Sequence, residues 1–193
     1  DSPRRILSPR HKAALQAASV LGQRFALDAL RNLIGDAGYD CGKLPEHHLV
    51  RREGDDFFFA HALVRDGVYG SLLRPRRRDL HVAAATWFAA ADPALRAEHL
   101  DRAGDPCAAG AYLEAARFQT EALRLEHARR LAERGLAAAA ERETLCALNC
   151  QLGELLRELG EPERSIEACE AALAQAGDAA DACRARLGIT EGL

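Results

Sequence analysis

The sequence predicts a mainly α-helical chain in two parts, the first with one small β-hairpin and the second built from antiparallel helical hairpins. Three observations lead to this expectation. Ala, Leu, Arg and Glu, all strong helix formers, dominate a chain of 193 residues in which only 5% are aromatic. The segment 49–59 combines two apolar extended runs with a turn. Small residues recur at a fixed spacing in the second half, which is typical of helical repeats.

Cap and turn residues set the limits of the helices at the start of the chain. Ser8 and Pro9 are typical of a helix start, and apolar positions at helical spacing continue from there to Gly22. A second amphipathic helix is expected over Phe25–Ile34. The segment Asp36–His47 is expected to contain a third element, which its glycines and proline interrupt.

A β-hairpin is expected next, with strands at Leu49–Glu53 and Phe57–Phe59 around a Gly-Asp-Asp turn. A helix over Ala62–Leu73 should follow, and Pro75 should open another with one apolar face. Three short helices and a hairpin are typical of a winged-helix domain. We therefore assign residues 1–90 to a winged-helix domain with trailing helices.

The second half carries the spacing of tetratricopeptide repeats, in which small residues lie where two helices cross closely. Gly153, Ser165 and Cys169 fall on such positions. Ala116 stands 37 residues before Gly153, since 153 − 116 = 37, and Gly188 stands 35 residues after it, since 188 − 153 = 35. We therefore expect residues 91–193 to form tetratricopeptide-like helical repeats, the last of them truncated.

Charge and cysteine usage limit the possible functions. Residues 1–90 hold 14 of the 26 basic and 10 of the 29 acidic residues, which gives 14 − 10 = +4 there and 12 − 19 = −7 in the remainder. An acidic second half disfavours nucleic-acid binding in that part.

Without a secretory signal, the six cysteines are expected to be reduced thiols of a cytoplasmic protein. Cys146 and Cys150 lack companion ligands, so no metal site is expected, and no apolar run is long enough to span a membrane.

The sequence resembles a known family in three segments, which read LSPRHKAALQAASVLG, FFFAHALVRDGVYGSLLRPRRRDLH and AEHLDRAGDPCAAGAYLEAA. They resemble the STAND-type ATPases of bacterial signalling proteins. They look most like those members that lie downstream of class III nucleotidyl cyclase domains or upstream of LuxR-type DNA-binding domains. In that family a P-loop ATPase precedes a winged helix and tetratricopeptide-like repeats. The resemblance covers nearly the whole chain, and the block Phe57–His81 is its most specific part. The P-loop is not in this sequence, so we expect no enzymatic activity from this segment.

The block also looks like the Met-His-Asp segment of the wider STAND class, whose histidine contacts the phosphates of bound ADP and holds a closed state. The resemblance puts this role on His61, with ADP or ATP bound by the parent protein and no cofactor in this segment. Ala62 departs from the wider class, which has Asp at that position. A histidine that caps or packs locally at the strand-to-helix junction is the alternative.

An arginine cluster follows in the same block and forms a basic patch, made of Arg74, Arg76, Arg77 and Arg78. Such a patch binds nucleic acid or an acidic partner surface. The alternative is a helix start whose arginines pair with carboxylates of the ATPase core or of the repeats.

The expected function is therefore that of a regulatory sensor. It would couple a protein or small-molecule signal on the repeats to the nucleotide state of an ATPase domain outside this chain, without contact to a membrane. One alternative is a DNA-binding winged-helix regulator. However, the element before the hairpin offers Lys43 alone among three acidic residues, where a recognition helix carries several cationic or amide side chains. Another alternative is a purely structural protein-interaction scaffold.

Overall fold

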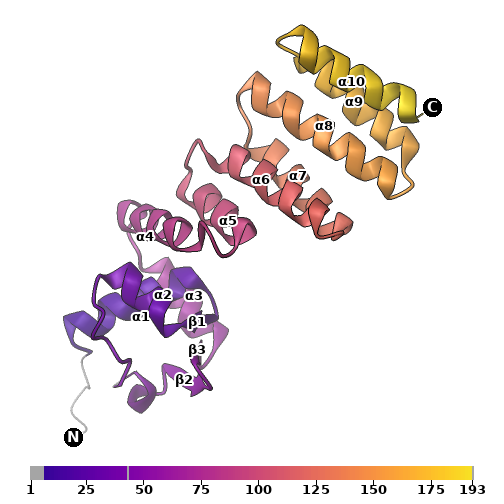
Figure 1. Ribbon diagram of the computed structural model, residues 1–193. Coiled ribbons are helices and arrows are strands. Elements are labelled where there is room, and N and C mark those ends of the chain that lie inside the picture. Colours follow the sequence, from indigo (N-terminus) through magenta and orange to yellow (C-terminus); the bar gives the residue numbers. More distant parts are fainter. Residues whose placement is uncertain (1–6, 43, 193) are drawn as a thin grey trace, which may run out of the picture. The chain divides into compact units, whose positions relative to one another are not determined.

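The computed structural model describes residues 7–42 and 44–192 and has the predicted fold: a mainly helical chain with a small β-hairpin, followed by tetratricopeptide-like helical hairpins (Figure 1). Internal contacts divide the chain into two compact units, Asp1–Trp87 and Phe88–Leu193. Each unit is described separately below, and the expected division into domains at 1–90 and 91–193 stays a prediction. Within the described part of the chain, no helix has both the length and the apolar composition that a membrane crossing requires.

The first unit combines short helices with a three-stranded antiparallel sheet of order β1-β3-β2. The Ser8 hydroxyl caps its first helix, as predicted, by accepting a hydrogen bond from the His11 N–H at 3.3 Å. In chain order, its elements are α1 (Pro9–Leu21), β1 (Arg24–Ala26), α2 (Leu27–Ile34), the 3-10 helix η1 (Pro45–His47), β2 (Val50–Glu53), β3 (Asp56–Phe59), α3 (Ala62–Gly70) and most of α4 (Arg74–Phe88).

Strand β1 corrects the helix expected over Phe25–Ile34, which begins only at Leu27. Phe25 lies opposite Phe57 in the sheet, and their stacked rings have centroids 6.0 Å apart. A cross-strand aromatic pair stabilises extended backbone. Because the apolar residue of a short strand also suits the first turn of an amphipathic helix, the local pattern did not distinguish the two.

The segment Asp36–His47, which was expected to contain a third element, has less helix than expected. Among the described residues of this segment, only those of η1 are helical. The Asp36 and Asp40 carboxylates accept hydrogen bonds from the backbone N–H groups of Gly38 and Gly42, at 3.2 Å and 2.9 Å. Such turns give the backbone an alternative to a helix.

The helix expected over Ala62–Leu73 ends early, at Gly70. Leu72 is buried in the core of the first unit, and α4 begins two residues later. The chain turns after Gly70 because burying Leu72 requires a change of direction. Because of this corner, α4 begins at Arg74, the first residue of the arginine cluster.

Aromatic residues of the sheet and apolar residues of the helices form the core of the first unit. They are all buried, and those at most 4% exposed include Phe25, Leu30, Tyr39, Phe57, Phe59 and Leu80. The hairpin thus contributes its inward-facing side to a core that otherwise comes from helices.

The second unit consists of helices, each of which packs against the next along the chain. Helix α8 also packs against α6 and α10, so these three lie side by side in one layer (Figure 1). This is the arrangement of two helical hairpins, α6–α7 and α8–α9, with α10 opening a third. The bounds are α5 (Pro93–Ala103), α6 (Ala108–Glu121), α7 (Leu125–Ala138), α8 (Arg142–Glu158), α9 (Pro162–Gln175) and α10 (Ala179–Gly192).

A close helix crossing lies where the repeat spacing predicted it. A Cβ atom at Gly153 in α8 would approach the Cys169 Sγ of α9 to 2.5 Å. The Ser165 hydroxyl donates a buried hydrogen bond of 2.7 Å to the Gly153 carbonyl oxygen. A Cβ atom at Gly188 in α10 would approach the same sulfur to 2.4 Å. The Cys169 thiol therefore fills the space that two glycines leave open.

Candidate functional site

His61 lies at the junction of β3 and α3, where it is the exposed N-cap residue of α3. Its carbonyl oxygen accepts hydrogen bonds from the N–H groups of Val64 and Arg65, at 3.0 Å and 3.3 Å. Its ring caps no backbone N–H and forms no hydrogen bond with any described residue. The imidazole is thus free to meet a partner beside the unpaired N–H groups of the first helical turn. Its predicted contact with a phosphate stays a prediction.

Helix α3 has an inner and an outer side. Val64, Val68 and Tyr69 pack against the core of the first unit. Leu63, next to the His61 side of the helix, is 84% exposed, and the glycines of this helix are exposed as well. The outer side of α3 therefore presents an exposed leucine and two glycines, so few side chains would keep a partner away from the helix backbone.

The structure separates the four arginines of the predicted basic patch. The Arg77 Nη2 atom donates hydrogen bonds to the carbonyl oxygens of Tyr69 and Leu72, at 3.3 Å and 3.2 Å. Its guanidinium carbon lies 4.6 Å from the centroid of the Tyr69 ring. Arg77 therefore closes the carboxyl end of α3. The other three, Arg74, Arg76 and Arg78, are exposed, and none forms an ion pair with a described carboxylate.

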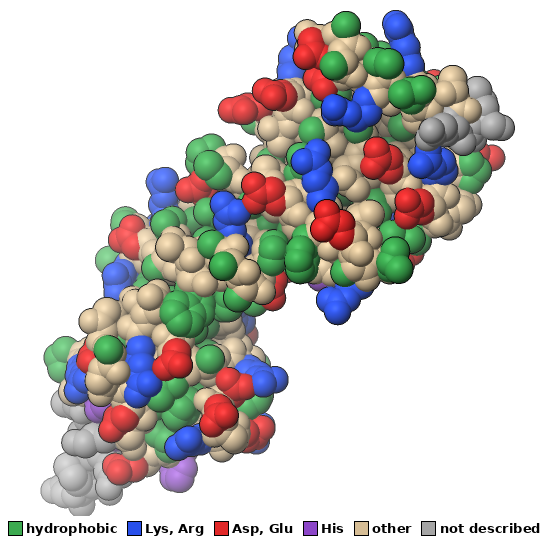
Figure 2. Space-filling view, viewed as in Figure 1, with side chains coloured by type: hydrophobic (Ala, Val, Ile, Leu, Met, Phe, Trp, Pro, Cys, Tyr) green, Lys and Arg blue, Asp and Glu red, His purple; other side chains and the backbone are tan. Residues whose placement is uncertain are grey.

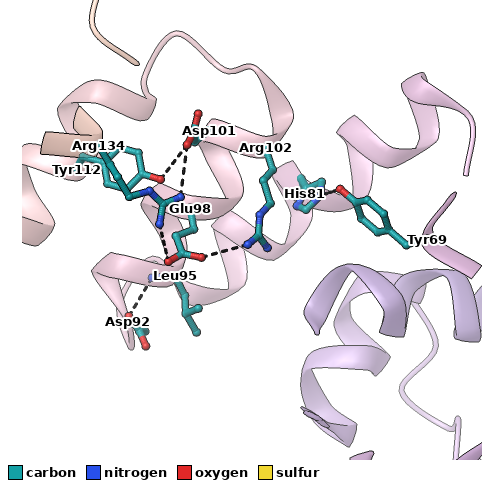
Figure 3. A network of polar contacts seen from close by, with 9 residues as sticks. All are labelled: Tyr69, His81, Asp92, Leu95, Glu98, Asp101, Arg102, Tyr112 and Arg134. Carbon is teal, nitrogen blue, oxygen red and sulfur yellow. Dashed lines mark hydrogen bonds and ion pairs between the residues drawn. The ribbon is translucent and has the colours of Figure 1, made fainter. Parts of the chain in front are cut away.

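Tyr69 joins α3 to α4 behind this patch. Its hydroxyl lies 2.9 Å from the Nε2 atom of His81, which is fully buried (Figure 3). The two rings meet edge to face, with centroids 5.9 Å apart. Arg65 covers the Tyr69 ring as well, at 5.6 Å from its centroid, and donates to the Ser19 carbonyl oxygen. The corner between α3 and α4 is therefore held by side chains of these two helices and by a backbone carbonyl of α1.

The DNA-binding alternative finds little support in the element before the hairpin. That element is η1, a single turn of three residues, Pro45–His47. A recognition helix needs several side chains on successive turns to reach base edges. Lys43, the cation expected there, lies outside the described residues. DNA binding by the first unit stays untested.

A polar network connects the first three helices of the second unit (Figure 3). Arg134 of α7 pairs with Glu98 at 2.8 Å and with Asp101 at 3.5 Å, both in α5. The Tyr112 hydroxyl of α6 donates to Asp101 at 2.9 Å, and the Arg134 guanidinium lies 4.8 Å from the centroid of the Tyr112 ring. Arg102 also contacts Glu98, at 3.4 Å. Burial and the hydrogen bond to Asp101 both raise the pKa of Tyr112, so its hydroxyl stays a donor at neutral pH.

His99 of α5 is buried beside this network and is 2% exposed. Its ring stacks on Phe88, with centroids 5.6 Å apart and planes 7° from parallel. Burial, which disfavours the charged imidazolium, and then the nearby Arg102 lower the pKa of His99 to about 4. His99 is therefore neutral at pH 7 and serves packing.

Two adjacent cavities form a groove across α6, α8 and α10, which we call the A-helix groove. One has a volume of about 290 Å³ and the other about 170 Å³. Both are lined by Cys150, Glu154 and Arg184, so they are continuous. The first is also lined by Arg117, Ala147 and Gln151, and the second by Arg157, Cys169, Leu187 and Gly188.

The sequence analysis did not identify this groove, because its lining residues come from four helices, α6, α8, α9 and α10. Arg117 and Arg184 are far apart in sequence and share no local motif. A signal was nevertheless present. Arg117 stands 154 − 117 = 37 residues before Glu154, the same spacing that relates Ala116 to Gly153. The repeat pattern therefore puts both side chains on one face.

Three cysteine thiols lie beneath the groove. Cys146, Cys150 and Cys169 are each at most 5% exposed. Burial is the largest cause that raises the pKa of each thiol, and it raises that of Cys150 to about 12. Neutral thiols are poor nucleophiles and poor metal ligands. They act as small apolar groups, and two of them, Cys150 and Cys169, line the groove.

Comparison with known proteins yields one structural relative. No family model and no curated protein matches the chain. Among solved structures, it is similar to a signal transduction ATPase with numerous domains (STAND) protein with a tetratricopeptide repeat sensor, from Pyrococcus horikoshii. The TM-score is 0.51 at 12% sequence identity, and the match covers 96% of this chain. It covers 35% of that protein, so this chain spans about a third of its length. At this identity, the likeness shows a common fold.

Proposed function

We propose that this chain is the regulatory segment of a STAND signalling ATPase. In this proposal, the repeats receive a signal and the first unit passes it to the nucleotide state of an ATPase domain outside this chain. The observation that carries the proposal is the agreement of the fold with a STAND protein along 96% of the chain. The segment itself catalyses no reaction, and the parent protein is a cytoplasmic bacterial one.

The first unit is the winged helix of this protein. Its order of elements, α1-β1-α2-η1-β2-β3, and its sheet order, β1-β3-β2, support this assignment. The third helix of the unit is reduced to η1, which suits a protein-binding role better than a DNA-binding one. The outer side of α3 and the free arginines of α4 then face the ATPase domain.

His61 is the residue through which this unit senses the nucleotide. ADP or ATP would be bound by the ATPase domain, and this chain fits it by offering one exposed imidazole at a helix N-terminus. An imidazole N–H there can donate one hydrogen bond to a phosphate oxygen. The contact would hold the closed, ADP-bound state. A ligand on the repeats would favour the open state if it bound that state more tightly.

The output of the parent protein is a class III nucleotidyl cyclase or a LuxR-type DNA-binding domain. This part of the proposal depends on the resemblance of three sequence segments, 7–22, 57–81 and 97–116. Residues outside this chain would identify the output directly.

The test is ADP retention by the parent protein. We expect His61→Ala to weaken ADP binding about tenfold and to raise the basal output, because one charge-assisted hydrogen bond is lost. His61→Gln, which keeps a donor, should restore part of the affinity. The matched control is His48→Asn, since His48 is exposed in the same unit and Asn tolerates its positive φ of 54°. Unchanged ADP affinity and unchanged output in His61→Ala would refute the sensing role.

A further inference from the structure

The A-helix groove differs in charge from the unit that contains it. Residues 91–193 carry 12 − 19 = −7, and Figure 2 shows red acidic side chains interspersed with blue basic ones on the visible face of this unit. Among the described lining residues of the groove, three are arginines (Arg117, Arg157, Arg184) and one, Glu154, is acidic. The groove is thus a cationic site on an acidic unit, and long-range repulsion makes the remainder of the unit unattractive to anions.

Two of these arginines can accept a ligand without breaking strong contacts. Arg117 is exposed and forms no ion pair with any described carboxylate. The Arg184 side chain is 53% exposed, and its one ion pair with a described residue is a long contact of 3.5 Å with Asp181 on its own helix. An exposed pair of this kind contributes little and is easily exchanged. Both guanidinium groups keep donors for a carboxylate, which they bind with two parallel hydrogen bonds.

The rest of the groove offers apolar and neutral surface between these charges. Leu187 is 56% exposed, and Gly188 and Cys169 lie beside it. The Cys150 thiol, common to both cavities, has its pKa raised to about 12 and therefore carries no negative charge. Gln151 donates to the Thr120 hydroxyl at 3.3 Å and so links α8 to α6 beneath the ligand. An apolar side chain of a ligand could rest here between two carboxylates.

The shape favours an extended chain over a small molecule. Neither cavity exceeds about 290 Å³, and both open onto the same helix layer. Pockets for small molecules are mostly larger and predominantly apolar. A peptide that crosses α6, α8 and α10 would instead place successive side chains into adjacent shallow cavities.

We propose that the A-helix groove binds an acidic peptide segment of a partner protein, with its carboxylates on Arg117 and Arg184 and an apolar side chain against Leu187. This inference rests on the proposed function, because it specifies the signal that the repeats receive. The segment alternates acidic and apolar residues. Its binding weakens with salt, since the contacts are ionic and exposed.

Peptide selection by the purified chain tests this proposal. A display library of random peptides of about 12 residues, long enough to cross three helices about 10 Å apart, is selected against the wild-type chain. We expect enrichment of Asp and Glu among the selected peptides. The double variant Arg117→Glu/Arg184→Glu should reverse this preference toward Lys and Arg. Selected peptides without acidic residues, or no selected peptide, would overturn the proposal.

The best selected peptide is then measured by fluorescence anisotropy. Arg117→Glu and Arg184→Glu should each weaken its affinity at least about tenfold. A matched control is Arg186→Glu, because Arg186 is exposed on the same helix but outside the groove. Equal losses of affinity in Arg184→Glu and Arg186→Glu would mean that binding depends on net charge alone, which would also overturn the proposed binding site.

Failure of this proposal is distinguishable from failure of the proposed function. Peptide selection uses the chain alone and requires no nucleotide, whereas the His61 test reads ADP retention in the parent protein. If His61 senses ADP but no acidic peptide binds, the regulatory function stands with another signal. If acidic peptides bind but ADP retention ignores His61, the groove is a docking site unconnected to the nucleotide.

Discussion

The two complete helical hairpins of the second unit have the same spacing but are stabilised by different chemistry. In α8–α9, the crossing has Gly153 on one helix and Cys169 on the other. The residues 37 positions earlier in α6–α7 are Ala116 and Ala132, both fully buried. Glycine plus cysteine and alanine plus alanine have the same number of side-chain heavy atoms. The total number of side-chain heavy atoms at the crossing is therefore the same in the two hairpins, but its division between the two helices differs.

The surroundings of the two crossings differ as well. Charged and titratable groups accompany α6–α7, namely the network around Arg134 and the buried His99. Neutral thiols and the buried hydrogen bond from Ser165 to Gly153 accompany α8–α9. A close-packed crossing requires only joint volume and satisfied polar groups, so one repeat pattern admits both solutions. Conditions that change charge should affect the stability of α6–α7, the first hairpin. Changes in side-chain volume should affect the stability of α8–α9, the second hairpin.

Acid is expected to have the largest effect, through His99. Because its pKa of about 4 in the folded protein is below its usual 6.5, folding favours the neutral ring. The associated stability is complete above pH 6.5 and is lost as the pH falls toward 4, where the loss reaches about 3 kcal/mol. Urea unfolding of the chain at a series of pH values measures this slope, and hydrogen exchange locates it in α5 and α6.

The variant His99→Gln isolates this effect from the titration of carboxylates. Glutamine stays neutral, so the variant should lose less stability than the wild type between pH 6.5 and 4. His127→Gln is the matched control, because His127 belongs to α7 and its side chain is not buried. Parallel pH profiles for wild type and His99→Gln would show that the buried ring does not control the acid response.

A smaller effect is expected from added volume at the second crossing. In Gly153→Ala, the new Cβ atom would lie 2.5 Å from the Cys169 sulfur and 3.3 Å from the Ser165 carbonyl oxygen. We expect a loss of about 2 kcal/mol in the free energy of unfolding, since overpacking outweighs the better helix propensity of alanine. The double variant Gly153→Ala/Cys169→Ala reproduces the alanine pair of the other hairpin and should recover much of that loss.

A glycine of the first hairpin provides the control for this comparison. At Gly110 in α6, an added Cβ atom would meet no atom within 4 Å. Gly110→Ala should therefore stabilise the chain by up to about 1 kcal/mol through helix propensity alone. If Gly153→Ala were equally stabilising in urea unfolding, the thiol would not limit the volume at the crossing.

The sequence was sufficient for the mainly helical fold and for the crossing in the second unit, but not for the features that depend on distant partners. Gly153, Ser165 and Cys169 are separated by fixed intervals, so their roles follow from periodicity. Strand β1 depends on pairing between Phe25 and Phe57, which no local pattern records. The A-helix groove likewise combines Arg117 and Arg184 from helices that lie far apart in the sequence. His61 was identified by resemblance, and the structure adds that its ring is exposed.

The smallest expected effect concerns the ion pairs of the first hairpin, and it sharpens the comparison through salt. Arg134 is 41% exposed and contacts Glu98, Asp101 and the Tyr112 ring. Arg134→Gln should cost about 1 kcal/mol at low salt, because partly exposed ion pairs and cation–π contacts contribute modestly. In about 1 M NaCl, where charges are screened beyond roughly 3 Å, the difference should shrink by half or more. Arg130→Gln, an exposed arginine of the same helix, should change neither value. A loss that persists at high salt would assign the role of Arg134 to packing on Tyr112, and the first hairpin would then resemble the second more than its charges indicate.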